Sequence, residues 1–374
     1  MDKIIRLSKS CIGPEEKLAV SKVLDKEYLG MGEEVKNFEE LLKAFFNRPV
    51  VCVSSGTSAL QLAVQALNLN DGDEILVPSV TFVASFQAIT ANRIKPIPCD
   101  VNEDTLLIDL NDAQNKISEK TKAIMPVHYC GDCSDIKVVN DFAKKNNLRV
   151  IQDAAHAFGS TYQNEIIGSF GDIACFSFDG IKNITSGEGG CIVSSDKDII
   201  NKVKDFRLLG VENDSIKRYE KERSWFFDVK YQGWRYHMSN IMAAIGIEQL
   251  KKVDVLASKR KVLAKKYDDL LNGNKKIFSF KRDYGSINPH IYVVRINGLK
   301  NKKELIKKMN VRGIQIGSHY FPNHLLNYFK TNYSLPVSEK IFNEIITLPL
   351  HPDLEVNEID FIVKNLNEVL KNIN

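Results

Sequence analysis

The sequence predicts an α/β fold, with a mostly parallel sheet that carries helices on both faces and a smaller α+β part after it. Between residues 49 and 208, short apolar runs alternate with helical patterns. Most of these runs are apolar throughout, which is typical of parallel strands buried on both faces. A chain of 374 residues is also long for one core. We therefore expect a large domain over residues 1–248, whose first 13 residues are free to pack elsewhere, and a small domain over residues 249–374.

The elements follow in a regular order along the chain. Two helical patterns fill residues 14–46, and a polar, irregular stretch covers residues 210–236. A loop of that length in a compact domain is usually functional. The seven strands are expected near residues 50–53, 74–77, 94–98, 122–127, 149–152, 173–177 and 190–194. Later elements are expected as helices from 238 and near 254–272, a strand at 290–297, and helices near 302–311, 337–345 and 356–372.

The composition is that of an ordinary globular protein, with 44% hydrophobic and 26% charged residues. A net charge of +4 is too small to indicate a nucleic-acid partner. The lysine pairs at 302–303 and 307–308 lie on a helical pattern and are interpreted as a solvated face. The first residues contain no long apolar stretch, so neither a signal peptide nor a membrane span is expected. We expect a cytoplasmic protein.

A single lysine, Lys182, lies in a Gly-punctuated loop between two apolar strands, within residues 175–190. Lysine is unusual in such a turn unless its amine has a chemical role. Burial lowers the pKa of an ammonium group, which makes it a Schiff-base nucleophile or a proton carrier. The alternative is a solvated loop lysine. Three other segments favour the first interpretation, because together they supply the remaining parts of a pyridoxal phosphate site.

The first segment, residues 148–156, is a short buried strand that delivers Asp153 at its carboxyl end. A carboxylate at this edge can pair with a protonated pyridine nitrogen and keep the cofactor ring an electron sink. Asp153 could equally cap a helix that begins at Ala154. The residues of this segment alone leave both interpretations open.

The other two segments also end strands at the same edge of the sheet. Ser55, Gly56 and Thr57 open an amphipathic helix, and the free N–H groups of a helix N-terminus suit a phosphate. The turn lacks the ending of a Walker loop, and small hydroxyl residues also cap ordinary helices. Phe82 follows a strand that ends at Pro78. It could stack on a cofactor ring or belong to the core.

Together these segments resemble the sugar-nucleotide aminotransferases of the DegT/DnrJ/EryC1/StrS group, which have the aspartate-aminotransferase type of fold. The most specific part is Asp153-Ala154-Ala155-His156 followed by the Lys182 loop. The resemblance covers nearly the whole chain through Pro14-Glu15-Glu16, Leu29-Gly30-Met31-Gly32, Pro126-Val127-His128, His319-Tyr320, Leu335-Pro336 and Leu348-Pro349-Leu350.

The resemblance implies fold type I, with a seven-stranded sheet, and pyridoxal 5'-phosphate as the cofactor. Lys182 is implied as the lysine bonded to the cofactor, Asp153 as the partner of the pyridine nitrogen and His156 as a neighbour of the ring hydroxyl. Phe82 is implied to stack on the ring. Gly56, Thr57 and Ser177 are implied to bind the phosphate.

The resemblance also implies L-glutamate as amino donor, a nucleotide-linked keto sugar as acceptor, and a homodimer with shared active sites. The Gly187-Glu188-Gly189-Gly190 turn looks like that of members that aminate C4, whereas 3-aminating members tend to carry Gly-Asp. We therefore expect amination at C4 of a 4-keto-6-deoxyhexose, linked to dTDP before GDP or UDP. The product would feed a surface polysaccharide such as the O-antigen of lipopolysaccharide. The alternatives are a GDP-perosamine synthase and a 3-aminotransferase acting on a 3-keto sugar.

One segment departs from the family pattern. The family usually shows Gly-Tyr-Asn-Tyr-Arg before a Met-Ser/Thr-Asn-Ile helix, and its asparagine reaches the phosphate in the neighbouring subunit. Here Arg235 stands in place of that asparagine, and His237 in place of the arginine. Arginine binds phosphate through charge-assisted hydrogen bonds. We expect Arg235 to take this role across a dimer interface, and the role of His237 stays open.

Other chemistries are less well supported by the sequence. Seven cysteines without a secretion signal indicate reduced thiols. Cys130 and Cys133 form a C-x-x-C motif without a second pair, so no metal site is expected. A cysteine desulfurase needs a catalytic cysteine on a mobile loop, and none stands out. A dehydratase of the same family carries histidine in place of Lys182, and a non-catalytic regulator would have no reason to retain Lys182, Asp153 and His156 together.

Overall fold

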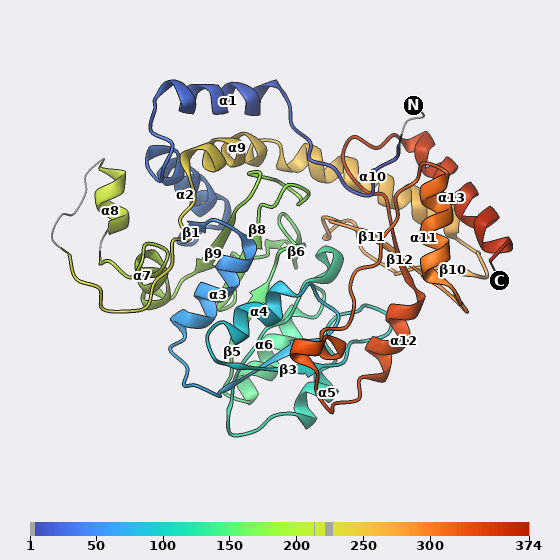
Figure 1. The fold of residues 1–374 in the computed structure, drawn as a ribbon, viewed down its shortest axis with the longest axis horizontal. Coiled ribbons are helices and arrows are strands. Elements are labelled where there is room, and N and C mark those ends of the chain that lie inside the picture. The colour runs from blue at the N-terminus through green and yellow to red at the C-terminus, as the bar shows by residue number, and fades with distance from the viewer. Residues whose placement is uncertain (1–3, 213, 221–226, 374) are drawn as a thin grey trace.

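The computed structural model describes residues 4–212, 214–220 and 227–373, and it contains the predicted seven-stranded sheet (Figure 1). The strand order is β1-β9-β8-β5-β4-β2-β3. Strand β9 runs antiparallel to its neighbours β1 and β8, and the other neighbours in this sheet are parallel. The predicted mostly parallel sheet is therefore confirmed. Its strands are β1 (Val50–Val53), β2 (Glu74–Pro78), β3 (Lys95–Cys99), β4 (Thr121–Ile124), β5 (Arg149–Asp153), β8 (Ile173–Ser177) and β9 (Gly190–Ser194).

Helices cover both faces of this sheet. Successive residues of a strand point to opposite sides, so a strand that is apolar throughout needs a covering layer on each face. Val51 and Val53 of β1 pack on one side with a first set of helices, and Val50 and Cys52 pack on the other side with a second set. The first set is α3 (Gly56–Ala66), α4 (Ala84–Thr90) and α7 (Lys197–Phe206). The second set is α2 (Glu33–Phe46), α9 (Asn240–Leu250) and, farther along the sheet, α6 (Ile136–Lys145). Two more helices are α1 (Pro14–Asp25), which lies along α9, and the short α5 (Leu110–Asn115).

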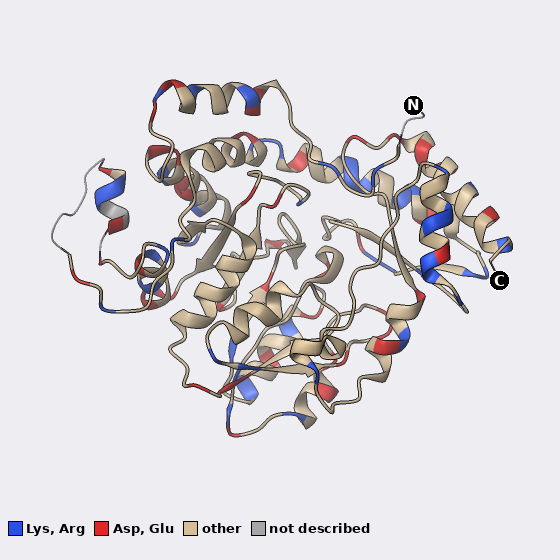
Figure 2. Cartoon of the chain, in the orientation of Figure 1, with Lys and Arg blue, Asp and Glu red and all other residues tan. Residues whose placement is uncertain are grey.

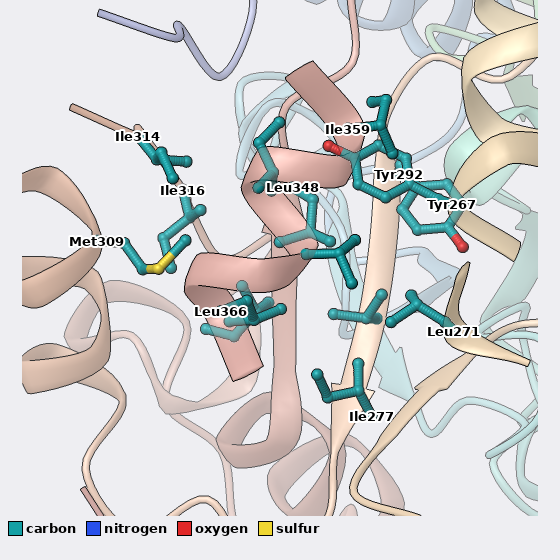
Figure 3. Packing of buried hydrophobic residues seen from close by; sticks show 14 of the residues in the cluster. Tyr267, Leu271, Ile277, Tyr292, Met309, Ile314, Ile316, Leu348, Ile359 and Leu366 are labelled. Atoms are coloured by element: carbon teal, nitrogen blue, oxygen red, sulfur yellow. The ribbon is translucent and has the colours of Figure 1, made fainter. Parts of the chain in front are cut away.

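A smaller antiparallel sheet follows in the C-terminal part, in the order β10-β11-β12. Its residues share one apolar cluster with the helices beside it (Figure 3), in which the rings of Tyr267 and Tyr292 stack with their centroids 4.5 Å apart. The strands are β10 (Ile277–Ser279), β11 (Tyr292–Ile296) and β12 (Ile345–Leu348), and the helices are α10 (Val253–Leu271), α11 (Lys302–Val311), α12 (Pro336–Glu344) and α13 (Val356–Lys371). The expected strand at 290–297 is present as β11, whereas the sequence does not predict β10 or β12.

The N-terminal segment packs against this C-terminal part. Ile5 forms a parallel bridge with Ile314, and the N–H of Leu350 donates to the carbonyl of Leu7 at 3.1 Å. Farther along, the hydroxyl of Ser10 donates to the carbonyl of Gly180, two residues before Lys182. The first described residues thus connect the small sheet to the lysine loop.

The stretch 210–236 is less irregular than its sequence predicts. A six-residue helix, α8 (Asp214–Tyr219), interrupts it. Residue 213 and residues 221–226 lie outside the described part of the chain. Near the C-terminal end of the stretch, Arg235 bridges to Leu208, just after α7, and His237 bridges to Val53 of β1.

Figure 2 shows Lys and Arg interspersed with Asp and Glu on the outer helices, α11 and α13 included. Lys303 and Lys307 are exposed, as the pattern predicts. Lys302 differs, because its Nζ donates to the hydroxyl of Ser318 at 2.9 Å and lies 3.8 Å from the centroid of the Phe342 ring. Burial lowers the pKa of Lys302 to about 8. This side chain is part of the packing between α11 and its neighbours, not of a solvated face.

A buried ion pair ties α2 to α7 and α8. Arg207, at the end of α7, has no exposed side-chain surface and contacts Oε1 of Glu39 at 2.5 Å. The Tyr219 hydroxyl donates to Oε2 of Glu39 at 2.6 Å, and the N–H of Cys52 donates to Oε1 at 2.8 Å. Glu39 therefore holds one strand and two helices in place.

Substitution Glu39→Ala leaves the Arg207 guanidinium buried without its carboxylate. We expect the free energy of unfolding to fall by about 3–5 kcal/mol, as for other broken buried pairs. Glu40→Ala is the matched control, because the Glu40 side chain is 62% exposed and pairs with Lys43 at the surface. Chemical denaturation should show a change below about 1 kcal/mol for the control. Equal effects of the two substitutions would contradict the structural role of Glu39.

Candidate active site

A cavity of about 500 Å³ opens at the carboxyl edge of the seven-stranded sheet, where open α/β folds bind their ligands. The N-terminus of α3 and the segments after β2, β5 and β8 form its walls, together with His319 and Tyr320 from the C-terminal part. Seven of the eight predicted site residues line it: Gly56, Thr57, Phe82, Asp153, His156, Ser177 and Lys182. The eighth, Arg235, lines a different cavity.

The first turn of α3 forms one end of the cavity. Ser55 caps the helix by accepting the N–H of Ser58 at 3.0 Å, which leaves the N–H groups of Gly56 and Thr57 at the cavity wall. Glycine is required at position 56, because a Cβ there would lie 2.7 Å from the Cβ of Ser177. This close approach places the Ser177 hydroxyl beside the helix N-terminus. The turn combines N–H donors, a hydroxyl and a positive dipole end, which suits an anionic group.

Asp153 lies on the cavity wall at the end of β5 and is only 6% exposed. Oδ2 accepts the hydroxyl of Ser85 at 2.7 Å, and Oδ1 accepts the N–H of Ala155 at 3.2 Å. The residues after Asp153 form turns rather than a helix, so the helix-cap interpretation is wrong. The carboxylate is instead held in one orientation by Ser85, a residue that the sequence does not single out.

Lys182 extends from the loop between β8 and β9 and lies partly buried on the cavity wall. Burial lowers the pKa of its ammonium, and the nearby Asp179 and Asp153 oppose this shift only in part. Its Nζ lies 3.4 Å from Nε2 of His290, which precedes β11. The loop itself is fixed from behind, because Nη2 of Arg260 donates to the Lys182 carbonyl at 3.0 Å.

His156 faces the same cavity in the neutral form. Burial, followed by the positive charge of Lys182, holds its pKa well below the ordinary value for histidine. Nδ1 accepts the N–H of Cys130 at 3.4 Å, which leaves the ring proton on Nε2, 3.0 Å from the hydroxyl of Tyr320. Tyr320, which the sequence singles out only within the His319-Tyr320 motif, fixes this ring.

Phe82 is 56% exposed, which is unusual for a large aromatic residue. Its ring lies on the cavity wall, with its centroid 5.8 Å from that of Tyr320. The interpretation of Phe82 as a core residue is therefore wrong. The ring has an open face beside the group of Asp153, His156 and Lys182.

The C-x-x-C motif lies behind this site, and both of its thiols are buried. Cys130 and Cys133 are free, buried thiols, and burial raises the pKa of each to about 12. The backbone of Cys130 serves the site through its hydrogen bond to His156. His128 packs underneath, with Nε2 2.9 Å from Oε1 of Gln152. Within the described ranges, no group of three potential metal ligands is found.

Arg235 and His237 lie on another face of the molecule, in a cavity of about 320 Å³. The cavity is bordered by exposed apolar residues, with Phe227 62% and Val229 51% exposed. Burial and the charges of Arg218 and Arg235 lower the pKa of His237 to about 4. Arg235 therefore does not reach the Lys182 cavity of its own chain.

Comparison with known proteins extends the similarity to the whole chain. The DegT/DnrJ/EryC1/StrS aminotransferase family model matches residues 10–367. The chain is 29% identical to the spore coat polysaccharide biosynthesis protein SpsC of Bacillus subtilis, and the match covers 96% of this chain and 95% of that protein.

Solved structures agree with the family match. The Helicobacter pylori aminotransferase PseC, involved in the biosynthesis of pseudoaminic acid, has a TM-score of 0.92 and 28% identity, with 99% and 100% of the two chains covered. The putative sugar aminotransferase Spr1654 of Streptococcus pneumoniae in its PMP form has a TM-score of 0.90 and 29% identity, with 99% and 98% covered. These matches confirm the predicted fold type I and the predicted enzyme class, that of PLP-dependent aminotransferases. The chain belongs to the DegT/DnrJ/EryC1/StrS aminotransferase family.

Proposed function

We propose that this enzyme transfers the amino group of L-glutamate to C4 of a nucleotide-linked 4-keto-6-deoxyhexose, with dTDP-4-keto-6-deoxyglucose as the favoured acceptor. The observation that carries the proposal is the grouping of a partly buried lysine amine, a fixed carboxylate and a neutral histidine around one cavity. These are the side chains of Lys182, Asp153 and His156. Asp153 and His156 belong to the end of β5 and the turn after it, and Lys182 belongs to the loop between β8 and β9.

The residues present fit pyridoxal phosphate, as the family membership requires. The N–H groups of Gly56 and Thr57 and the hydroxyl of Ser177 form an anion site that would hold the phosphate. At the other end, Asp153 would pair with the protonated pyridine nitrogen, and Phe82 offers an open aromatic face for the ring. His156, with its proton on Nε2, would lie beside the ring hydroxyl. When bound, the cofactor supplies the electron sink that stabilises a carbanion.

The protein's own groups then handle the protons. Burial lowers the pKa of Lys182, which favours the unprotonated amine that can take the proton from the α-carbon of glutamate. In the second half-reaction the same Nζ returns a proton to the sugar carbon that carries the new amino group. The carboxylate of Asp153 would stabilise a positive ring nitrogen, and Ser85 keeps that carboxylate in position.

The preference for C4 rests on the turn at residues 187–190. Glu188, the residue that distinguishes this turn from the Gly-Asp of 3-aminating members, is exposed and lines the cavity together with Lys182. Its carboxylate can accept a hydrogen bond from a hydroxyl group of a bound sugar. Burial, followed by the charge of Asp179, raises the pKa of Glu188. The competing assignments are a GDP-perosamine synthase and a 3-aminotransferase that acts on a 3-keto sugar.

A role in polysaccharide synthesis is supported by the names of the relatives. SpsC is a spore coat polysaccharide biosynthesis protein, and PseC acts in the biosynthesis of pseudoaminic acid. We propose a cytoplasmic enzyme that supplies an amino sugar for a surface polysaccharide or O-antigen. In the described part of the chain, no helix combines the length and apolarity needed to cross a membrane. A cysteine desulfurase is disfavoured because the described cavity wall contains no cysteine.

The substrate is tested by offering dTDP- and GDP-4-keto-6-deoxyhexose with glutamate and locating the new amine by NMR. We expect an amine at C4 and faster turnover of the dTDP sugar. A matched Glu188→Asp variant should lower kcat/KM more than Glu248→Asp, since Glu248 pairs with Lys251 on the surface. An amine at C3, or turnover only of a 3-keto sugar, would overturn the regiochemistry and leave the aminotransferase assignment in place.

We also propose a homodimer in which Arg235 binds the cofactor phosphate of the neighbouring subunit. Arg235 lies away from its own Lys182 cavity, on a segment with exposed Phe227, Val229 and Tyr231. Exposed apolar residues of this kind favour a protein interface. Arg235 would add a charge-assisted bond to a phosphate already held by a helix N-terminus.

Mixing Lys182→Ala dimers with Arg235→Ala dimers tests this arrangement, since a hybrid dimer has one site with both groups intact. After full exchange of subunits, we expect activity from about one quarter of the sites, because half of the dimers are hybrids with one good site each. In the control mixture, Arg93→Ala replaces Arg235→Ala, because Arg93 is exposed and lines neither cavity; about half of the sites should then be active before and after exchange. Confirmed exchange without recovered activity would contradict the shared site.

A further inference from the structure

His290 is the nearest described polar partner of the Lys182 amine, and the sequence patterns do not single it out. Its Nε2 lies 3.4 Å from Nζ of Lys182, and its ring packs on that of His156 with a centroid distance of 4.4 Å. The residue is 3% exposed. It belongs to the segment before β11, so it reaches the site from the C-terminal part of the chain.

Several buried hydrogen bonds hold His290 against the lysine loop. The side chain of Asn183 donates to the carbonyl of Asn288 at 3.0 Å, which joins the residue after Lys182 to the residue two before His290. Asn288 in turn donates to the carbonyl of Phe158 at 2.9 Å and, through its N–H, to the hydroxyl of Ser160 at 3.0 Å. The approach of His290 to Lys182 is therefore built into the packing of three segments.

The surroundings of the His290 ring select one tautomer. Nδ1 is buried and has no described hydrogen-bond partner. A buried N–H without a partner is rarer and more costly than a buried acceptor without one. The proton therefore resides on Nε2, which points at Lys182. Burial is the largest cause that keeps the pKa of His290 well below the ordinary value, so the ring stays neutral.

We propose that His290 is a positioning residue that donates its Nε2–H to the lone pair of the free Lys182 amine and so holds that amine uncharged between the two half-reactions. The charged and titratable groups around this pair are Asp179, Asp153, His156, His319 and Arg260. Only His290 has a described hydrogen bond to Nζ within this group. The inference rests on the proposed role of Lys182, but its test needs no cofactor.

The test is the pKa of Lys182 in the cofactor-free full chain, measured by competitive acylation at a series of pH values and peptide mass spectrometry. In His290→Phe, which keeps a ring against His156 but removes the donor, we expect the pKa of Lys182 to rise by about half to one unit. In His290→Gln, whose amide can donate, we expect it to stay close to the wild-type value. Lys302 is an internal reference, because burial alone sets its pKa and it contacts Ser318 and Phe342 instead.

An unchanged or lower pKa of Lys182 in His290→Phe would overturn the proposal and leave His290 as a packing residue. An equal rise in His290→Gln would also overturn it, because the loss would then not depend on the donor. If the Phe variant does not fold, the Gln variant still tests the proposal, because a rise in its Lys182 pKa relative to Lys302 would contradict it. Failure of pyridoxal phosphate to bind would contradict the proposed function without affecting this measurement.

Discussion

Replacing Lys182 with alanine is expected to leave a folded protein whose turnover falls by about 10³-fold or more. Lys182 provides the described amine on the cavity wall, and in the proposed reaction this amine is the base for the proton at the α-carbon of glutamate. Both half-reactions should fail together, because both use the same Nζ. Single-turnover measurements with glutamate and with the keto sugar would show this.

The control for this substitution is Lys259→Ala, at an exposed position on α10 one residue from Arg260. It should leave turnover unchanged. Borohydride reduction of the holoenzyme followed by peptide mapping provides a second readout, and the cofactor should be found on Lys182. A label on any other lysine would exclude Lys182 as the covalent partner.

Asp153→Ala is expected to reduce turnover by about 10²- to 10³-fold, the range found when a preorganised electrostatic partner is removed. The carboxylate faces the cavity from the end of β5, and its position is fixed by Ser85 and by the N–H of Ala155. Without it, a bound cofactor would lose the negative charge proposed to keep its pyridine nitrogen protonated. The fold should survive, because the side chain is at a strand end and starts no helix.

Asp153→Asn separates charge from shape, since the amide can still accept the hydroxyl of Ser85. A loss similar to that of the alanine variant would show that the negative charge is what matters. Asp283→Asn, on an exposed turn, is the matched control. Near-normal turnover of Asp153→Ala with bound cofactor would show that Asp153 has only a structural role.

The sequence predicts the large sheet well because its strands are short and continuously apolar. All seven runs appear as strands, and the helices between them lie on both faces. Strands β10 and β12 are harder to predict, since β10 has three residues and β12 follows α12 directly. The boundary near residue 249 remains a prediction. Helix α10 packs Val253 and Leu256 with the large sheet and Leu263 with the small one.

The site residues that could be predicted are those in local motifs. Lys182, Asp153 and the Gly56 turn each end a strand at the same edge, so their chemistry and their meeting point follow from sequence order. His290 and Ser85 could not be found in this way. Each has an ordinary local sequence and reaches the site only through packing between distant segments.

The proposed reaction transfers an amino group from glutamate to a keto sugar through one cofactor held by Lys182. The most direct test is the visible absorbance of the holoenzyme during sequential addition of the two substrates. We expect glutamate alone to bleach the band, and dTDP-4-keto-6-deoxyglucose to restore it in proportion to the sugar added. A band that glutamate does not bleach, or a bleached form that no nucleotide-linked keto sugar restores, would contradict this proposal.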